Sequence, residues 1–179
     1  MKLSEFILGR MPFCILDIET TGFLADTHEI LEISAIQVGA GFDIIGETSC
    51  LTRTANRVPS LITEITGITD DMLRAHGQPL AEVLAHVHRF VGDHPAYAHN
   101  AQFDRGFLNA SAAREGLDIR FSLACSIPVF KRLLPGRESY DLQALAKAFQ
   151  LEDDGAHRAL ADCRMLLGCL KRAHRNIAV

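Results

Sequence analysis

The stretch that decides the fold is FCILDIETTG, residues 13–22. Its apolar run from Phe13 to Leu16 is typical of a buried β-strand, which we expect to continue to Glu19. Side chains two residues apart on a strand project from the same face, so Asp17 and Glu19 should lie side by side. Neighbouring carboxylates repel each other and raise each other's pKa unless a cation neutralises them. Because hard oxygen ligands favour Mg²⁺ or Mn²⁺, the pair predicts a divalent metal site.

Two later motifs add a further acid each, and the second also places a histidine five residues before its acid. AHNAQFD (98–104) ends in Asp104, and AHRALAD (156–162) contains His157 and Asp162. On one continuous helix, His157 and Asp162 would point about 140° apart and could not face the same site. The conflict disappears if His157 lies in the loop before the helix, which Gly155 and the acidic run 152–154 favour.

Composition favours one globular domain. A chain of 179 residues buries roughly 70% of its unfolded surface, so it needs no metal or disulfide to fold. The five cysteines form no CxxC pair, and we expect reduced thiols in the core. A net charge of −4 argues against a protein that grips long nucleic acid by bulk electrostatics, but it leaves room for a short end held locally.

Local patterns predict a strand-rich first third followed by helices. We expect strands over Phe13–Glu19, Ile30–Val38, Phe42–Thr52, Ala96–His99 and Phe121–Cys125. We expect helices over Thr69–Ala75, Leu80–Val91, Phe103–Glu115, Pro128–Leu134, Asp141–Phe149 and Ala159–His174. Strands joined by helices imply parallel pairing through right-handed crossovers. The sequence therefore predicts an α/β fold with a mixed sheet flanked by helices.

The order of the motifs resembles that of the DEDDh family of 3′-to-5′ exonucleases. DIETTG, HNAQFD and HRALAD follow one another as the three exonuclease motifs do, and the stretches ITGITDDML (65–73) and SYDLQALAKAF (139–149) are also similar to family sequence. The family includes the proofreading epsilon subunit of bacterial DNA polymerase III and ribonuclease T. The resemblance implies a ribonuclease H-like, five-stranded mixed sheet in the order 3-2-1-4-5. We assign residues 12–175 to the exonuclease domain, residues 1–11 to a leader segment and residues 176–179 to the C-terminal end.

The resemblance also implies the chemistry, which is phosphodiester hydrolysis with two divalent cations, Mg²⁺ or Mn²⁺. Asp17 would bridge the two ions, Glu19 and Asp162 would complete the first site, and Asp104 would support the second. His157 would act as the general base, because a histidine can accept a proton from the attacking water near neutral pH. These five residues are the candidate catalytic groups, and the expected products are nucleoside 5′-monophosphates.

The turn after Glu19 and the segment before Asp104 supply candidate substrate contacts. They are Thr20, Thr21, Gly22, Phe23, His99, Asn100 and Phe103. In the family a bulky apolar residue at the position of Phe23 acts as a wedge against the terminal base, and stacking on an aromatic ring tolerates any base sequence. Taken singly, however, Phe23 and Phe103 are more typical of a core.

Each acidic residue also has a structural interpretation. Asp17 and Glu19 could end a strand in solvent, Asp104 could cap a helix, and Asp162 could lie on a solvated helix face. The three motifs together favour an enzyme. Two functional alternatives stay open: an exoribonuclease that trims RNA 3′ ends, and a non-catalytic nucleic-acid-binding or polymerase-binding module. A binding module would have no need of carboxylates that repel phosphate.

The expected partner is a nucleic acid 3′ end, with single-stranded DNA favoured. The chain ends at Val179, soon after the segment with Asp162, so we expect a free-standing exonuclease or one whose polymerase contact uses the folded surface. No apolar stretch approaches the ~20 residues of a membrane span, and no signal peptide is recognisable at the N-terminus. We therefore expect a cytoplasmic protein without a membrane partner.

Overall fold

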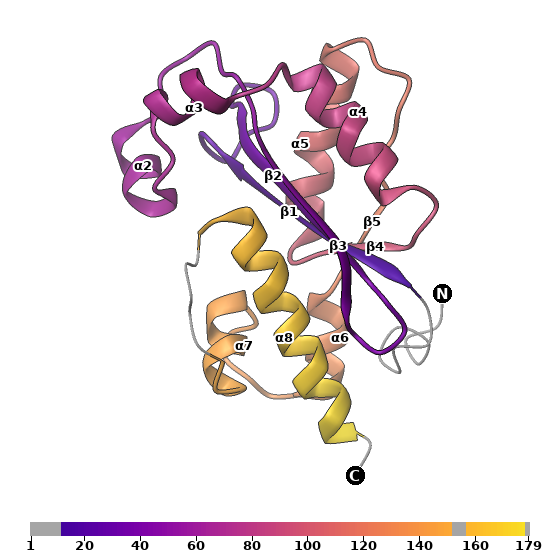
Figure 1. The fold of residues 1–179 in the computed structure, drawn as a ribbon. Coiled ribbons are helices and arrows are strands. Elements are labelled where there is room, and N and C mark those ends of the chain that lie inside the picture. The colour runs from indigo at the N-terminus through magenta and orange to yellow at the C-terminus, as the bar shows by residue number, and fades with distance from the viewer. Residues whose placement is uncertain (1–11, 152–156, 178–179) are drawn as a thin grey trace.

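The computed structural model describes residues 12–151 and 157–177, which form a five-stranded sheet between two layers of helices (Figure 1). The strands are β1 (Phe13–Thr20), β2 (Ile30–Val38), β3 (Ile44–Leu51), β4 (Ala96–Ala98) and β5 (Leu123–Cys125). Their order is β3-β2-β1-β4-β5, which confirms the predicted 3-2-1-4-5 order of a ribonuclease H-like sheet. β1 therefore lies at the centre.

The sheet is mixed, as predicted. β1 pairs antiparallel with β2 and parallel with β4. In the antiparallel register Asp17 lies opposite Ser34, and Glu19 lies opposite Glu32. Because β4 ends at Ala98, it pairs with only the first half of β1. The second half of that edge is left to the helix that follows β4.

Alternation along β1 divides its side chains between the two helix layers. Phe13 and Ile15 pack in one cluster with α8 (Ala159–Ile177), whereas Cys14, Leu16 and Ile18 pack in the other with α4 (Leu80–Val91) and α5 (Ala101–Arg114). In Figure 1, α8 lies with α6 (Ile127–Leu133) and α7 (Leu142–Ala148) on one side of the sheet, and α4 and α5 lie on the other. Since residues two apart share a face, Asp17 and Glu19 continue the face that α8 covers.

The helices follow the predicted pattern with small shifts at their ends. They are α2 (Ser60–Thr66), α3 (Asp70–His76), α4 (Leu80–Val91), α5 (Ala101–Arg114), α6 (Ile127–Leu133), α7 (Leu142–Ala148) and α8. α2 was not predicted, because SLITEIT is rich in β-branched residues that disfavour a helix. Its flanks held the available signal: Pro59 precedes it, and Gly67 ends it in the left-handed conformation.

The fold also tests two predictions about side chains, one for Asp104 and one for the cysteines. The N-cap of α5 is Asn100, and Asp104 lies in the fourth position of that helix, so the interpretation of Asp104 as a helix cap was wrong. The prediction of reduced core thiols is confirmed: all five cysteines are free, and only Cys125 is not fully buried.

Some predictions fall outside the described residues. These are the leader segment 1–11, the acidic run with Gly155 before His157, and the final residues 178–179. Within the described parts of the chain, none of the helices combines the length and the apolar composition needed to cross a bilayer.

Candidate metal-dependent active site

Two neighbouring carboxylates of β1 and a third that is distant in sequence converge on the α8 side of the sheet. Asp17 and Glu19 project from the second half of β1, and Asp162 lies in the first turn of α8. One carboxylate oxygen from each lies within 4.8 Å of the others. The convergence follows from packing, because the apolar face of α8 covers the same side of the sheet from which Asp17 and Glu19 project.

Asp104 approaches the group from the open edge of β1. It lies in α5, whose start follows β4 directly, and its side chain is almost completely buried. Burial raises the pKa of Asp104 to about 7, although hydrogen bonds from the backbone N–H groups of Asp104 itself and of Ile18 favour the charged carboxylate. Asp104 is not part of the three-carboxylate group, yet its charge acts on Asp17 more than that of any other residue.

Burial and repulsion among the acids dominate the electrostatics of the group. Burial and then the neighbouring carboxylates, Asp104 first, raise the pKa of Asp17 well above its usual range. Burial and then Asp162 raise the pKa of Glu19 to about 8, and Arg158 lowers it only in part. Across from Asp17, the buried hydroxyl of Ser34 has no hydrogen-bond partner within the described chain.

These residues fit hard divalent cations. The donors are carboxylate oxygens, which Mg²⁺ and Mn²⁺ prefer, and the raised pKa values of Asp17 and Glu19 mean that a bound cation would relieve both repulsion and desolvation. Asp17, Glu19 and Asp162 could hold one ion, and Asp104 could contribute to a second next to Asp17. The acidic group supports metal binding, while the identity and number of the ions stay predictions.

His157 lies outside the helix, where the sequence spacing put it. The first helical bond of α8 runs from the N–H of Asp162 to the carbonyl of Arg158, so His157 precedes the helix. Its side chain is exposed, and its backbone adopts the left-handed conformation with a φ of 65°. This placement removes the 140° conflict expected on one continuous helix, and the role of His157 as a base stays a prediction.

The predicted turn after Glu19 is held by its own side chains. The hydroxyl of Thr20 donates to the carbonyl of Gly22 at 2.6 Å, and the hydroxyl of Thr21 accepts from the N–H of Glu29 at 2.9 Å. A Cβ at Gly22 would collide with the ring of His28, so a larger residue there would require that ring to move. The turn thus fixes the residue that follows it.

Phe23 is presented to solvent by this turn. Its side chain is 85% exposed, so the interpretation of Phe23 as a core residue was wrong. Phe103 differs, because it is partly buried and its ring centroid lies 4.9 Å from that of Phe107. Of the two predicted stacking residues, Phe23 is therefore the one whose ring is open to a ligand.

Both ring nitrogens of His99 have hydrogen-bond partners within the protein. Its Nε2 donates to the carbonyl of Tyr140 at 2.8 Å, since a carbonyl can only accept, and Nδ1 pairs with the hydroxyl of Ser126 at 2.9 Å. Burial lowers the pKa of His99, which favours the neutral ring. Asn100 beside it is exposed, with a φ of 61°. His99 therefore links the end of β4 to the segment just before α7. Substrate contacts of His99 and Asn100 stay predictions.

One buried acid near the group was not predicted. Glu32 lies on β2 directly opposite Glu19 and is only 1% exposed. The sequence did carry a signal, because Glu32 interrupts an otherwise apolar strand, ILEISAIQV. An acid at such a position needs partners once it is buried.

The chain matches known exonucleases over nearly its whole length. The model of the exonuclease family RNase_T matches residues 14–170. The chain is 33% identical over 167 residues to DNA polymerase III subunit epsilon of Aquifex aeolicus, and the match covers 92% of this chain and 81% of that subunit. It is 38% identical over 152 residues to the PolC-type DNA polymerase III of Halalkalibacterium halodurans, covering 84% of this chain but only 10% of that polymerase.

A solved structure gives the same result in three dimensions. Exonuclease X, in complex with 5′ overhanging duplex DNA, superposes with a TM-score of 0.73 at 27% sequence identity. The match covers 93% of each chain. The similarity therefore extends over a whole exonuclease, and not only over a shared core.

Proposed function

This chain belongs to the exonuclease family, and we propose that it removes nucleotides from the 3′ end of single-stranded or frayed DNA and releases nucleoside 5′-monophosphates. The observation that carries the proposal is the convergence of Asp17, Glu19 and Asp162 within 4.8 Å. Such a group would be costly in a binding module, because it repels phosphate and because the pKa values of Asp17 and Glu19 are raised. It is useful where cations must be held against a phosphodiester.

We propose that the four carboxylates hold two divalent cations, Mg²⁺ or Mn²⁺, with Asp17 shared between them. When bound, such ions polarise the attacking water and stabilise charge on the leaving oxygen. Glu19 and Asp162 would complete one coordination site, and Asp104 would support the other. The buried position of Asp104, anchored by the Ile18 amide, suits a ligand that must hold a fixed place.

Within this scheme His157 takes the proton from the attacking water. Its exposed ring next to the start of α8 leaves it room to reach the substrate and to return the proton to solvent. Phe23 would stack on the terminal base. Its ring is exposed on a turn held by Thr20 and Thr21, so binding a base would bury apolar surface without rearranging the backbone.

DNA is favoured over RNA by the relatives. The epsilon subunit and the PolC-type enzyme are named as parts or forms of DNA polymerase III, and exonuclease X was solved with DNA. Association with a polymerase is a second candidate arrangement, which the similarity to the epsilon subunit favours. In that arrangement the same site would remove mispaired 3′ ends.

Matched oligonucleotides test the proposal. We expect Mg²⁺- or Mn²⁺-dependent shortening of a 5′-labelled DNA strand from its 3′ end, no shortening in EDTA, and slower shortening of the same sequence as RNA. A mismatched terminus should be degraded faster than a paired one, because opening a paired step costs about 1.4 kcal/mol of stacking. Binding without turnover would instead favour a non-catalytic module, and faster loss of RNA would favour an exoribonuclease.

The Phe23→Ala variant should lose the preference for unpaired ends, and equal rates on all ends in the unaltered protein would contradict the stacking role.

A further inference from the structure

Glu32 is a buried carboxylate that the proposed reaction does not use. It lies on β2 opposite Glu19, and directly opposite residues share a face of the sheet, so it lies beside the metal-binding acids. It is 1% exposed. Because a buried acid among other acids is strongly disfavoured, Glu32 persists there only through specific partners.

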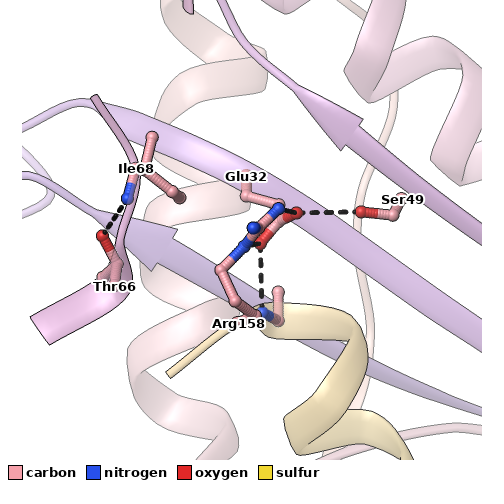
Figure 2. A network of polar contacts seen from close by, with 6 residues as sticks. Glu32, Ser49, Thr66, Ile68 and Arg158 are labelled. Atoms are coloured by element: carbon pink, nitrogen blue, oxygen red, sulfur yellow. Dashed lines mark hydrogen bonds and ion pairs between the residues drawn. The ribbon is translucent and has the colours of Figure 1, made fainter. Parts of the chain in front are cut away.

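Those partners come mainly from the start of α8 (Figure 2). The guanidinium of Arg158 donates twice to the Glu32 carboxylate, from Nε at 3.0 Å and from Nη2 at 2.7 Å. The hydroxyl of Ser49 on β3 donates at 2.9 Å. A bidentate arginine–carboxylate pair is strong and directional, and it fixes the orientation of both groups.

The fourth hydrogen bond to Glu32 comes from the backbone of α8 itself. The N–H of Ala159 donates to Oε2 of Glu32 at 3.1 Å. Ala159 is the first residue of the helix, and N–H groups there have no partner within the helix. Arg158 occupies the N-cap position but has no side-chain oxygen with which to cap. Glu32 supplies the missing acceptor from β2, and its negative charge suits a helix N-terminus.

This anchor holds the residue next to the candidate base. His157 is bonded directly to Arg158 and adopts a left-handed φ of 65°, which is uncommon for a residue other than glycine. Asp162 has a separate support, because Cys163 and Leu166 are buried against the sheet. The Glu32–Arg158 contact therefore bears mainly on His157.

We propose that Glu32 is a positioning residue for the exonuclease reaction: through Arg158 and the Ala159 amide it holds His157 in place before α8. The inference rests on the proposed function, because it assigns His157 a part in the reaction. Glu32 itself touches neither water nor substrate in this scheme. Its effect on the rate passes through the backbone at residues 157–159.

The test compares Glu32→Gln with Glu47→Gln. Glu47 also pairs with an arginine of α8, since its carboxylate lies 2.7 Å from Nη2 of Arg164, but this pair is farther along the helix and exposed. We expect Glu32→Gln to lower kcat about 10²-fold, the scale of a misplaced catalytic group, with little change in KM or in Mn²⁺ affinity measured by calorimetry. Glu47→Gln should match the unaltered protein in all three.

A double-mutant cycle separates positioning from a general structural role. In the His157→Ala background, Glu32→Gln should lower kcat less than about threefold, because residues that act as a unit are not additive. A full 10²-fold loss in that background, or an unchanged kcat in the single variant, would overturn the proposal. If Glu32→Gln does not fold, Arg158→Lys serves in its place, because it keeps the charge but loses the bidentate fork.

Hydrogen exchange tells a failure of this inference from a failure of the proposed function. Exchange at residues 157–162 should accelerate in Glu32→Gln but not in Glu47→Gln, whether or not the protein cleaves DNA. Faster exchange together with an unaltered protein that shows no exonuclease activity would contradict the proposed function alone. Unchanged exchange in Glu32→Gln would contradict the anchor itself.

Discussion

The two halves of β1 differ on the face that α8 covers. Phe13 and Ile15 in the first half are buried among apolar side chains, and Phe13 meets the rings of Phe42 and Tyr97 edge-on at 6.1 and 5.7 Å. In the second half the same face presents Asp17 and Glu19, whose pKa values are raised by burial and by other acids.

The difference shows how one strand can both stabilise a fold and carry a site that costs stability. The apolar half keeps β1 in the centre of the sheet, so that the acidic half cannot move away from Asp162 to relieve the repulsion. Substitutions in the apolar half of β1 should therefore lower stability, and substitutions in the acidic half should lower activity.

The largest expected effect comes from Asp17→Ala in the acidic half. Activity should be abolished, because Asp17 is central to the carboxylate group, whereas the melting temperature in EDTA should stay the same or rise, since one of several repelling carboxylates is gone. Initial rates on labelled single strands and thermal melts measure the two effects. Asp93→Ala is the matched control, because the exposed Asp93 precedes β4 at the opposite end of the parallel pair. Near-normal turnover in Asp17→Ala would refute the metal-site assignment.

The next effect concerns the histidine beside the acidic half. His157→Ala should lower kcat by about 10²–10⁴-fold, the usual contribution of a general base, and leave Mn²⁺ binding largely unchanged. The pH–rate profile should lose its acidic limb. His94→Ala, at an exposed position beyond α4, serves as the control. An unaltered kcat would remove His157 from the mechanism.

A substitution in the apolar half should do the reverse. Phe13→Ala should lower the free energy of unfolding by about 3–5 kcal/mol, because it leaves a cavity where a buried ring was. The kcat of the remaining folded protein should stay within about twofold of normal. Chemical denaturation gives the first quantity and assays in excess Mg²⁺ well below the melting temperature give the second. A large loss of kcat in fully folded Phe13→Ala would mean that the two halves are not separable.

The smallest expected effect is a dependence of stability on pH in the metal-free protein. The pKa of Glu19 rises from 4.5 to about 8 on folding, so the folded state binds more protons than the unfolded state between these values. The preference of the folded state for a protonated Glu19 therefore stabilises the fold fully below about pH 4.5, and this stabilisation is lost as the pH rises through about 8. We expect the melting temperature in EDTA to fall over that range and Mg²⁺ to restore it. Glu19→Gln should flatten the dependence, and an equal slope in both proteins would contradict the assignment.

Much of the fold was predictable because its signals are local. The alternation and apolar runs of β1 and β2, and the spacing of α4, are properties of neighbouring residues, and these elements lie where the sequence predicted them. The sheet order came instead from the resemblance of the three motifs to a known family. α2 was missed because its composition opposes a helix and only its flanking residues suggested one.

The sequence by itself determined which chemistry is present: an acidic pair on one strand face, an acid in each of two later segments, and a histidine that cannot share a helix face with Asp162. Only the tertiary structure decided how these groups meet. Asp104 approaches through the edge that β4 leaves open, Phe23 is exposed by a turn, and His99 is committed to Ser126 and Tyr140. Glu32 and Arg158 are the strongest case, because their pairing joins residues separated by 126 positions. The periodicity of a sequence predicts only which neighbouring residues share a face of a strand or helix. The contact between Glu32 and Arg158 depends instead on how β2 and α8 pack together.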